Sequence, residues 1–94
     1  MDYIMKIKDL KPHMRNLTLI VKVVSKSDVA MFNGKEYASA MVEDETGKIK
    51  LNLWREQVEQ AKVGETIKIT GAFAHVRAKA LQISSWSKFE VVSQ

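Results

Sequence analysis

The chain has 94 residues, 46% of them hydrophobic, and it contains no cysteine. This length holds one core, so we expect residues 1–94 to form a single domain that is stabilised by packing alone. Disulfides, thiol chemistry and cysteine-ligated zinc are excluded. The two histidines, His13 and His75, lie too far apart in sequence to favour an ordinary zinc site, so we expect neither metal nor cofactor.

The absence of cysteine favours a reducing cytosolic or nuclear compartment, and neither the first residues nor the hydropathy pattern points elsewhere. The first residues carry Asp2 and Asp9 and no long apolar run, which argues against a secretory signal. The most apolar stretch, residues 17–24, is interrupted by Lys22 and is much shorter than the roughly 20 residues of a membrane helix. We therefore expect no membrane association.

The charge is unevenly distributed along the chain. Residues 1–47 hold seven Lys or Arg against seven acids, whereas residues 48–94 hold eight against four, so the whole net charge of +4 lies in the second half. A basic half is compatible with a polyanionic partner, although many solvated surfaces are equally basic.

The first predicted strand covers residues 17–24. Its odd-numbered positions are all apolar, and Ile20 and Val24 add apolar side chains to the opposite face, which is typical of a strand that curls through a closed structure. Residues 25–37 contain Asn33 and Gly34, a strong hairpin signal. We expect this segment to be a flexible loop or a hairpin tip.

The next two predicted strands cover residues 37–43 and 48–54 and are joined by an acidic turn. In the first, Ala38, Ala40 and Val42 face the core. In the second, positions 49, 51 and 53 do so. The opposite face of residues 48–54 carries Lys48, Lys50, Asn52 and Trp54, so a large aromatic ring stands on a polar, basic side.

A short helix is predicted over residues 55–62, with Val58 and Ala61 covering the core. In the following strand, residues 66–78, the inward apolar positions change phase at Gly71, from Ile67 and Ile69 to Ala72, Ala74 and Val76, as a β-bulge would produce. After that change Phe73, His75 and Arg77 share the outward face.

The last predicted strand places Leu81 and Ile83 inward, with Gln82 and Ser84 outward and Trp86 in the same phase as these two. Phe89, Val91 and Val92 are expected to close the barrel. The resulting order, three strands, a short helix between strands three and four, and two more strands, is that of the all-β OB fold, a five-stranded Greek-key barrel.

The outward face resembles a single-strand binding surface, because aromatic rings stack on bases while neighbouring cations contact phosphates. The candidate residues are Trp54, Phe73, Arg77, Lys48, Lys50, Asn52, His75, Lys79 and Trp86. Several have structural alternatives: Trp54 capping the barrel end or packing under the helix that begins at Arg55, Phe73 turned into the core, Trp86 sealing the barrel end, and Lys48 and Lys50 simply solvated. Phe32 and Tyr37 could either anchor the loop or stack on bases. Lys26 and Lys35 are candidate loop closers, that is, cations with which the loop would close over the phosphates.

Catalysis has little support in the sequence. The acidic run at residues 43–45 is expected to form a charged turn rather than a metal cluster, and no Ser or Cys nucleophile motif accompanies His75. We therefore expect a binding protein and not an enzyme.

Three segments, residues 7–12, 42–54 and 63–69, resemble the single-OB single-stranded-DNA-binding proteins of archaea, their eukaryotic sensor relatives and the OB domains of replication protein A. The most specific is the run Asp-Glu-Thr-Gly-Lys-Ile-Lys-Leu-Asn-Leu-Trp. The resemblance implies base stacking by Trp54 and Phe73, a role in replication, recombination and repair, and a place at the nucleoid in the cytoplasm of an archaeon or in the nucleus of a eukaryote. The chain departs from the family at Arg77, where relatives carry another aromatic residue.

Two rival functions belong to other classes. One is an OB adaptor that binds a protein within a complex like replication protein A, and the other is an RNA-binding OB module. Lysines that interrupt the aromatic residues favour nucleic acid over a protein partner, whereas stacking does not distinguish DNA from RNA. We expect a monomer whose ligand is single-stranded DNA.

Overall fold

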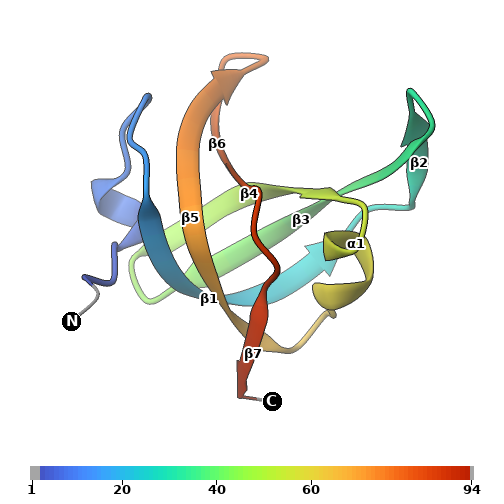
Figure 1. The fold of residues 1–94 in the computed structure, drawn as a ribbon. Helices are drawn as coiled ribbons and strands as arrows, with labels where there is room; N and C mark the ends of the chain where they lie inside the picture. The colour runs from blue at the N-terminus through green and yellow to red at the C-terminus, as the bar shows by residue number, and fades with distance from the viewer. Residues whose placement is uncertain (1–2, 94) are drawn as a thin grey trace.

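The computed structural model describes residues 3–93, which form a strongly curved sheet that closes on itself (Figure 1). The strands are β1 (Leu17–Lys26), β2 (Ala30–Phe32), β3 (Lys35–Asp44), β4 (Gly47–Trp54), β5 (Thr66–Arg77), β6 (Ala80–Ser85) and β7 (Glu90–Ser93). A 3-10 helix, η1 (Ile7–Asp9), precedes the sheet, and one short helix, α1 (Gln57–Gln60), follows β4.

Five strands close the barrel. They follow the order β1-β3-β4-β6-β5, and β5 pairs back with β1. The β4–β6 pairing is parallel, and the other pairings are antiparallel. The predicted OB fold is confirmed, with its helix after the strand that ends at Trp54. Strand β2 was not predicted as a strand, and it moves the helix to a place between β4 and β5 in the observed numbering.

The core follows the predicted alternation. Ala38, Ala40 and Val42 of β3 are at most 2% exposed, and Leu51 and Leu53 of β4 are fully buried. These side chains meet inside the barrel because a strand places alternate residues on the same face.

The bulge at Gly71 is also confirmed. Leu17 pairs with Ala72 and Leu19 with Ile69, so β5 has one residue more than β1 between these pairs. Gly71 has a φ of 68°, a left-handed conformation that glycine adopts without steric cost. The extra residue keeps Ile69 and Ala72 both buried and turns Phe73 to the outer face.

Three predictions about the elements need correction. The helix has only the residues of α1, although Val58 and Ala61 are buried as expected. Val76 is 55% exposed, because the outer end of β5 extends beyond the core. Val91 and Val92 are about half exposed, at 48% and 47%. They do not close the barrel, because the pairing of β1 with β5 does.

Lys26 is not a loop closer. Its Nζ donates hydrogen bonds to the backbone carbonyls of Val58 and of Ala61, the latter at 3.2 Å. Lys26 thereby satisfies carbonyl groups at the end of α1 that lack partners within the helix.

The acidic turn between β3 and β4 is a structural element. Asp44 Oδ2 accepts a hydrogen bond from the Ile7 N–H at 2.9 Å, and its Oδ1 accepts from the Thr46 N–H at 2.7 Å, the Thr46 hydroxyl at 2.5 Å and the Gly47 N–H at 3.2 Å. Partial burial disfavours the ionised carboxyl, but these hydrogen bonds outweigh it and lower the pKa of Asp44. The turn therefore fastens η1 to the barrel.

Candidate nucleic-acid interface

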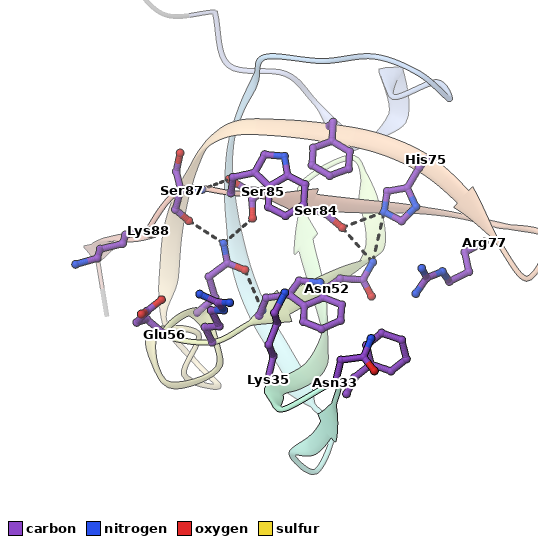
Figure 2. Close-up of a pocket in the computed structure, with 16 residues that line it drawn as sticks. Asn33, Lys35, Asn52, Glu56, His75, Arg77, Ser84, Ser85, Ser87 and Lys88 are labelled. Atoms are coloured by element: carbon purple, nitrogen blue, oxygen red, sulfur yellow. Dashed lines mark hydrogen bonds between the residues drawn. The ribbon is translucent and has the colours of Figure 1, made fainter.

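A groove of about 690 Å³ runs over the outer face of the barrel where β4, β6 and β5 lie side by side. Six of the predicted site residues line it: Asn52, Trp54, Phe73, His75, Arg77 and Trp86. Figure 2 shows Asn33 and Lys35 on one side of the groove and Ser84, Ser85 and Ser87 on the other. In the same view Arg77 and Lys88 lie at opposite ends.

One side of the groove carries an aromatic cluster, here called the Trp54 cluster, made of Phe32, Tyr37 and Trp54. Tyr37 and Trp54 are register partners on β3 and β4, and their ring centroids are 4.6 Å apart. The β2–β3 hairpin brings Phe32 edge-on to Trp54 at 6.0 Å. The indole therefore lies on the outer face beside two further rings, and it does not cap the barrel.

The other side carries the Phe73 cluster, made of Phe73, His75 and Trp86. The Phe73 and Trp86 rings stack with centroids 5.6 Å apart and an angle of 29° between planes, and the His75 ring lies 5.6 Å from Phe73. Trp86 is 84% exposed, so it does not seal the barrel end. Phe73 points outward because the bulge at Gly71 shifts the phase of β5.

The floor between the clusters is a hydrogen-bonded network centred on Asn52. Its Nδ2 donates to Gln82 Oε1 at 2.9 Å and to Ser84 Oγ at 3.3 Å, and its Oδ1 accepts from the Tyr37 hydroxyl at 2.9 Å. Asn52 was expected to be an open contact residue, but it is only 2% exposed and its amide is engaged. Gln82 and Ser84 lie on the outer face as predicted, yet both are buried within this network.

His75 belongs to the same floor. Its Nε2 lies 2.9 Å from Ser84 Oγ and 3.5 Å from Asn52 Nδ2. Burial, and secondarily the nearby charge of Arg77, lower the pKa of His75. The imidazole is therefore a predominantly neutral group at pH 7.

The cations of the groove differ in part from those predicted. Arg77 lines it as expected, but Lys48, Lys50 and Lys79 are outside its lining, and Lys48 lies 4.0 Å from Glu43. Lys35, a candidate loop closer, lines the groove. Sequence reasoning missed Arg55 and Lys88, which also line it; both lie outside the alternating strands, so no periodic pattern could assign their direction.

Within residues 3–93 no three acidic or histidine side chains gather closely enough to hold a metal ion. The same residues include no helix long and apolar enough to cross a bilayer.

Comparison with known proteins agrees with this geometry. The chain is 30% identical over 90 residues to the single-stranded DNA binding protein Ssb of Saccharolobus solfataricus, an alignment that covers 92% of this chain and 61% of that protein. The chain thus spans less than two thirds of the length of this relative.

Solved structures show the same fold. A domain of replication protein A from Methanococcus maripaludis superposes with a TM-score of 0.81 at 25% identity, covering 100% of this chain and 98% of that one. A replication protein A heterotrimer bound to single-stranded DNA gives a TM-score of 0.75 at 20% identity, covering 97% of this chain and 24% of that one. Residues 10–91 match the family described as single-stranded DNA binding protein Ssb-like, OB fold. The chain therefore belongs to the Ssb-like family of OB-fold single-stranded-DNA-binding proteins.

Proposed function

We propose that the chain binds single-stranded DNA with little sequence preference, stacking bases on Trp54 at one side of the groove and on Phe73 and Trp86 at the other. The observation that carries this proposal is the pair of aromatic clusters that flank one groove on the outer face of an OB barrel. Every base offers a π-face to such rings, so stacking discriminates little between DNA sequences.

The polar floor supports low sequence preference. Reading a base edge requires donors and acceptors that are free to pair with it, but the amide of Asn52 is engaged with Tyr37, Gln82 and Ser84. His75 Nε2 is likewise turned toward Ser84. In this proposal Asn52 and His75 shape the floor beneath the bases.

Cations along and beyond the groove would contact the phosphates. Arg77 and Lys88 lie at its two ends, with Lys35 between them (Figure 2), and Arg55 also lines the groove. Lys48 and Lys50 on β4, together with Lys79 in the β5–β6 turn, would extend the track beyond the groove. If roughly three to five of these cations contact phosphates at the same time, log K against log salt should have a slope of about −2 to −3.5.

The wider role follows from the chemistry. A sequence-tolerant, non-enzymatic binder would protect exposed strands during replication, recombination and repair, acting as a monomeric domain beside the proteins of those processes. In an archaeal cell it would work in the cytoplasm at the nucleoid. A protein-adaptor role is less well supported, because basic side chains interrupt the aromatic surface.

The test is a fluorescence titration with dT, rU and duplex oligomers at two salt concentrations. Both tryptophans line the groove, so dT should quench the emission. Trp54→Ala and Phe73→Ala should each weaken binding by about 1–3 kcal/mol with the fold retained. Tyr3→Ala removes an aromatic ring that is 73% exposed and outside the groove, and it should bind like the parent. Normal affinity in folded Trp54→Ala would refute the proposal.

Two further arms of the titration separate alternatives. A planar guanidinium stacks on bases as well as pairing with phosphate, so Arg77→Lys should lose affinity, while Arg77→Phe should keep much of it with a shallower salt slope. Lys22→Ala, on β1 and outside the groove lining, is the matched charge control. Tighter binding of rU than dT would reassign the ligand to RNA, and a flat salt response would favour a protein partner.

A further inference from the structure

Trp86 is an exposed ring held in a defined place. It is 84% exposed, yet it stacks on Phe73 with centroids 5.6 Å apart. Trp86 follows the last residue of β6, Ser85, so ladder pairing does not extend to it. Its position therefore depends on what holds the backbone on either side of it.

Gln57 of α1 holds the backbone on both sides of Trp86 in place. Its Nε2 donates hydrogen bonds to the carbonyl of Ser85 at 2.7 Å and to the carbonyl of Ser87 at 2.8 Å, the residues immediately before and after Trp86. Figure 2 shows the dashed lines that reach Ser85 and Ser87. Ser85 Oγ adds a second tie, because it accepts from the Ser87 N–H at 3.1 Å and donates to the Thr70 carbonyl at 2.7 Å.

The remaining polar atom of Gln57 reaches the opposite side of the groove. Its Oε1 accepts a hydrogen bond from the Trp54 N–H at 3.1 Å. One amide group, in a side chain that is 5% exposed, thus joins the backbone at Trp54 to the backbone on both sides of Trp86. Both donors and the acceptor are used, so this amide has little capacity left for a ligand.

We propose that Gln57 is the positioning residue that sets the relation between Trp54 and Trp86 across the groove, so that both rings stand ready for bases before DNA arrives. This inference rests on the proposed function. Ordering a side chain in advance removes an entropic cost from binding, and for one large side chain that cost corresponds to about a three- to tenfold change in affinity.

The chain contains a matched control on the same helix. Gln60 Oε1 accepts a hydrogen bond from the Phe89 N–H at 2.9 Å, so it also ties α1 to the C-terminal segment. Gln60 does not line the groove, whereas Gln57 does. Loss of either amide should lower the stability of the fold, but only loss of the Gln57 amide should disturb the positions of the rings in the aromatic clusters.

The experiment compares the parent with Gln57→Met, Gln57→Glu and Gln60→Met. Methionine preserves length and loses all three hydrogen bonds of the amide. Glutamate keeps an acceptor for Trp54 but faces the carbonyls of Ser85 and Ser87 with oxygen, so it disturbs Trp86 selectively. Affinity for a labelled dT oligomer is measured by anisotropy below the unfolding transition of each variant. Gln57→Met should bind about three- to tenfold more weakly, Gln57→Glu at least as weakly because its carboxylate also adds negative charge to the groove lining, and Gln60→Met should bind like the parent.

A second readout follows Trp86 without DNA. In a Trp54→Phe background, the time-resolved fluorescence anisotropy of Trp86 should show faster local motion when Gln57 is replaced, and unchanged motion when Gln60 is replaced. A purely structural role for Gln57 would lower stability without altering this signal. Parent-like Trp86 motion and DNA affinity in the folded Gln57 variants would overturn the inference.

A third measurement uses only the parent protein, so it does not depend on whether any variant folds. The side-chain amide protons of Gln57 should exchange slowly with solvent, both free and with DNA, because both donors are engaged; rapid exchange would overturn the inference. If the parent fails to bind any oligomer, the proposed function is refuted, while the motion of Trp86 still tests the positioning role.

Discussion

Two of the two-residue hairpin turns share one geometry but differ in how well their residues suit it. Asn33 and Gly34 connect β2 to β3 with φ values of 51° and 76°, and Ala78 and Lys79 connect β5 to β6 with φ values of 54° and 64°. Two consecutive positive φ values define the type I′ turn, for which Asn-Gly is the preferred pair. Alanine and lysine in this conformation are strained by their Cβ atoms.

Exchanging the residues of the strained turn should therefore stabilise the protein. Relief of the left-handed strain at Lys79 should raise the free energy of unfolding by about 1–2 kcal/mol. Glycine gives the unfolded chain more conformational freedom, which offsets about 0.5–1 kcal/mol of this gain. Asparagine at position 78 should add a few tenths. The double variant Ala78→Asn/Lys79→Gly should gain about 1 kcal/mol, which corresponds to about 4–8 °C in Tm.

The assay is thermal and urea unfolding followed by circular dichroism, with the reciprocal exchange Asn33→Ala/Gly34→Lys as the matched control. That exchange should cost a similar amount with an unchanged urea m-value. The reasoning is refuted if the first exchange fails to stabilise and the second fails to destabilise, since turn geometry would then not control the stability of either hairpin.

The single substitution Lys79→Gly tests whether Lys79 contacts phosphate. Lys79→Gly should raise stability and, if the proposed phosphate track reaches this turn, should also weaken DNA binding and reduce the magnitude of the salt slope by about 0.7. Ala78→Asn alone keeps the charge and should leave the slope unchanged. A parent-like slope in Lys79→Gly would remove this residue from the track.

Three further substitutions test individual interactions. Asp44→Ala removes the hydrogen bonds that fasten η1 and should lower the free energy of urea unfolding by about 2–3 kcal/mol. Because the native pKa of Asp44 is lowered, the stability that this carboxylate adds to the parent is present above about pH 4. It should fade as the pH falls through the native pKa. The pKa of His75 is also lowered, so protonation favours the unfolded chain, and stability should fall as the pH drops below about 6.5; a His75→Gln variant that keeps this slope would contradict the assignment. Lys26→Met should lose about 1–2 kcal/mol by leaving the carbonyls at the end of α1 without their donor, whereas its DNA affinity, measured by anisotropy, should be unchanged.

Much of the barrel could be predicted from local patterns. The period of two in residues 48–54 assigns a buried face and an outer face without any tertiary information, because a strand alternates its side chains. The phase change at Gly71 similarly predicts the bulge that turns Phe73 outward. These features depend on neighbours in the sequence, so the sequence by itself determined the OB fold and the face on which the groove lies.

Alternation assigns a face but does not reveal which other residues share it. Asn52 lies on the predicted outer face, yet it is buried because Gln82, Ser84 and Tyr37 reach it from other strands. Lys26 could equally have extended toward DNA, but it turns to the carbonyls at the end of α1. Both outcomes depend on segments distant in sequence.

The relation between the two aromatic clusters was decided by tertiary structure alone. Nothing in the local pattern around residue 57 distinguishes its amide from that of Gln60, and the two act on different parts of the C-terminal segment. The difference arises because barrel closure brings the segment after β6 against α1. A buried amide is satisfied by whichever backbone groups the closed fold brings within reach, and here those groups belong to Trp54 and to the two neighbours of Trp86.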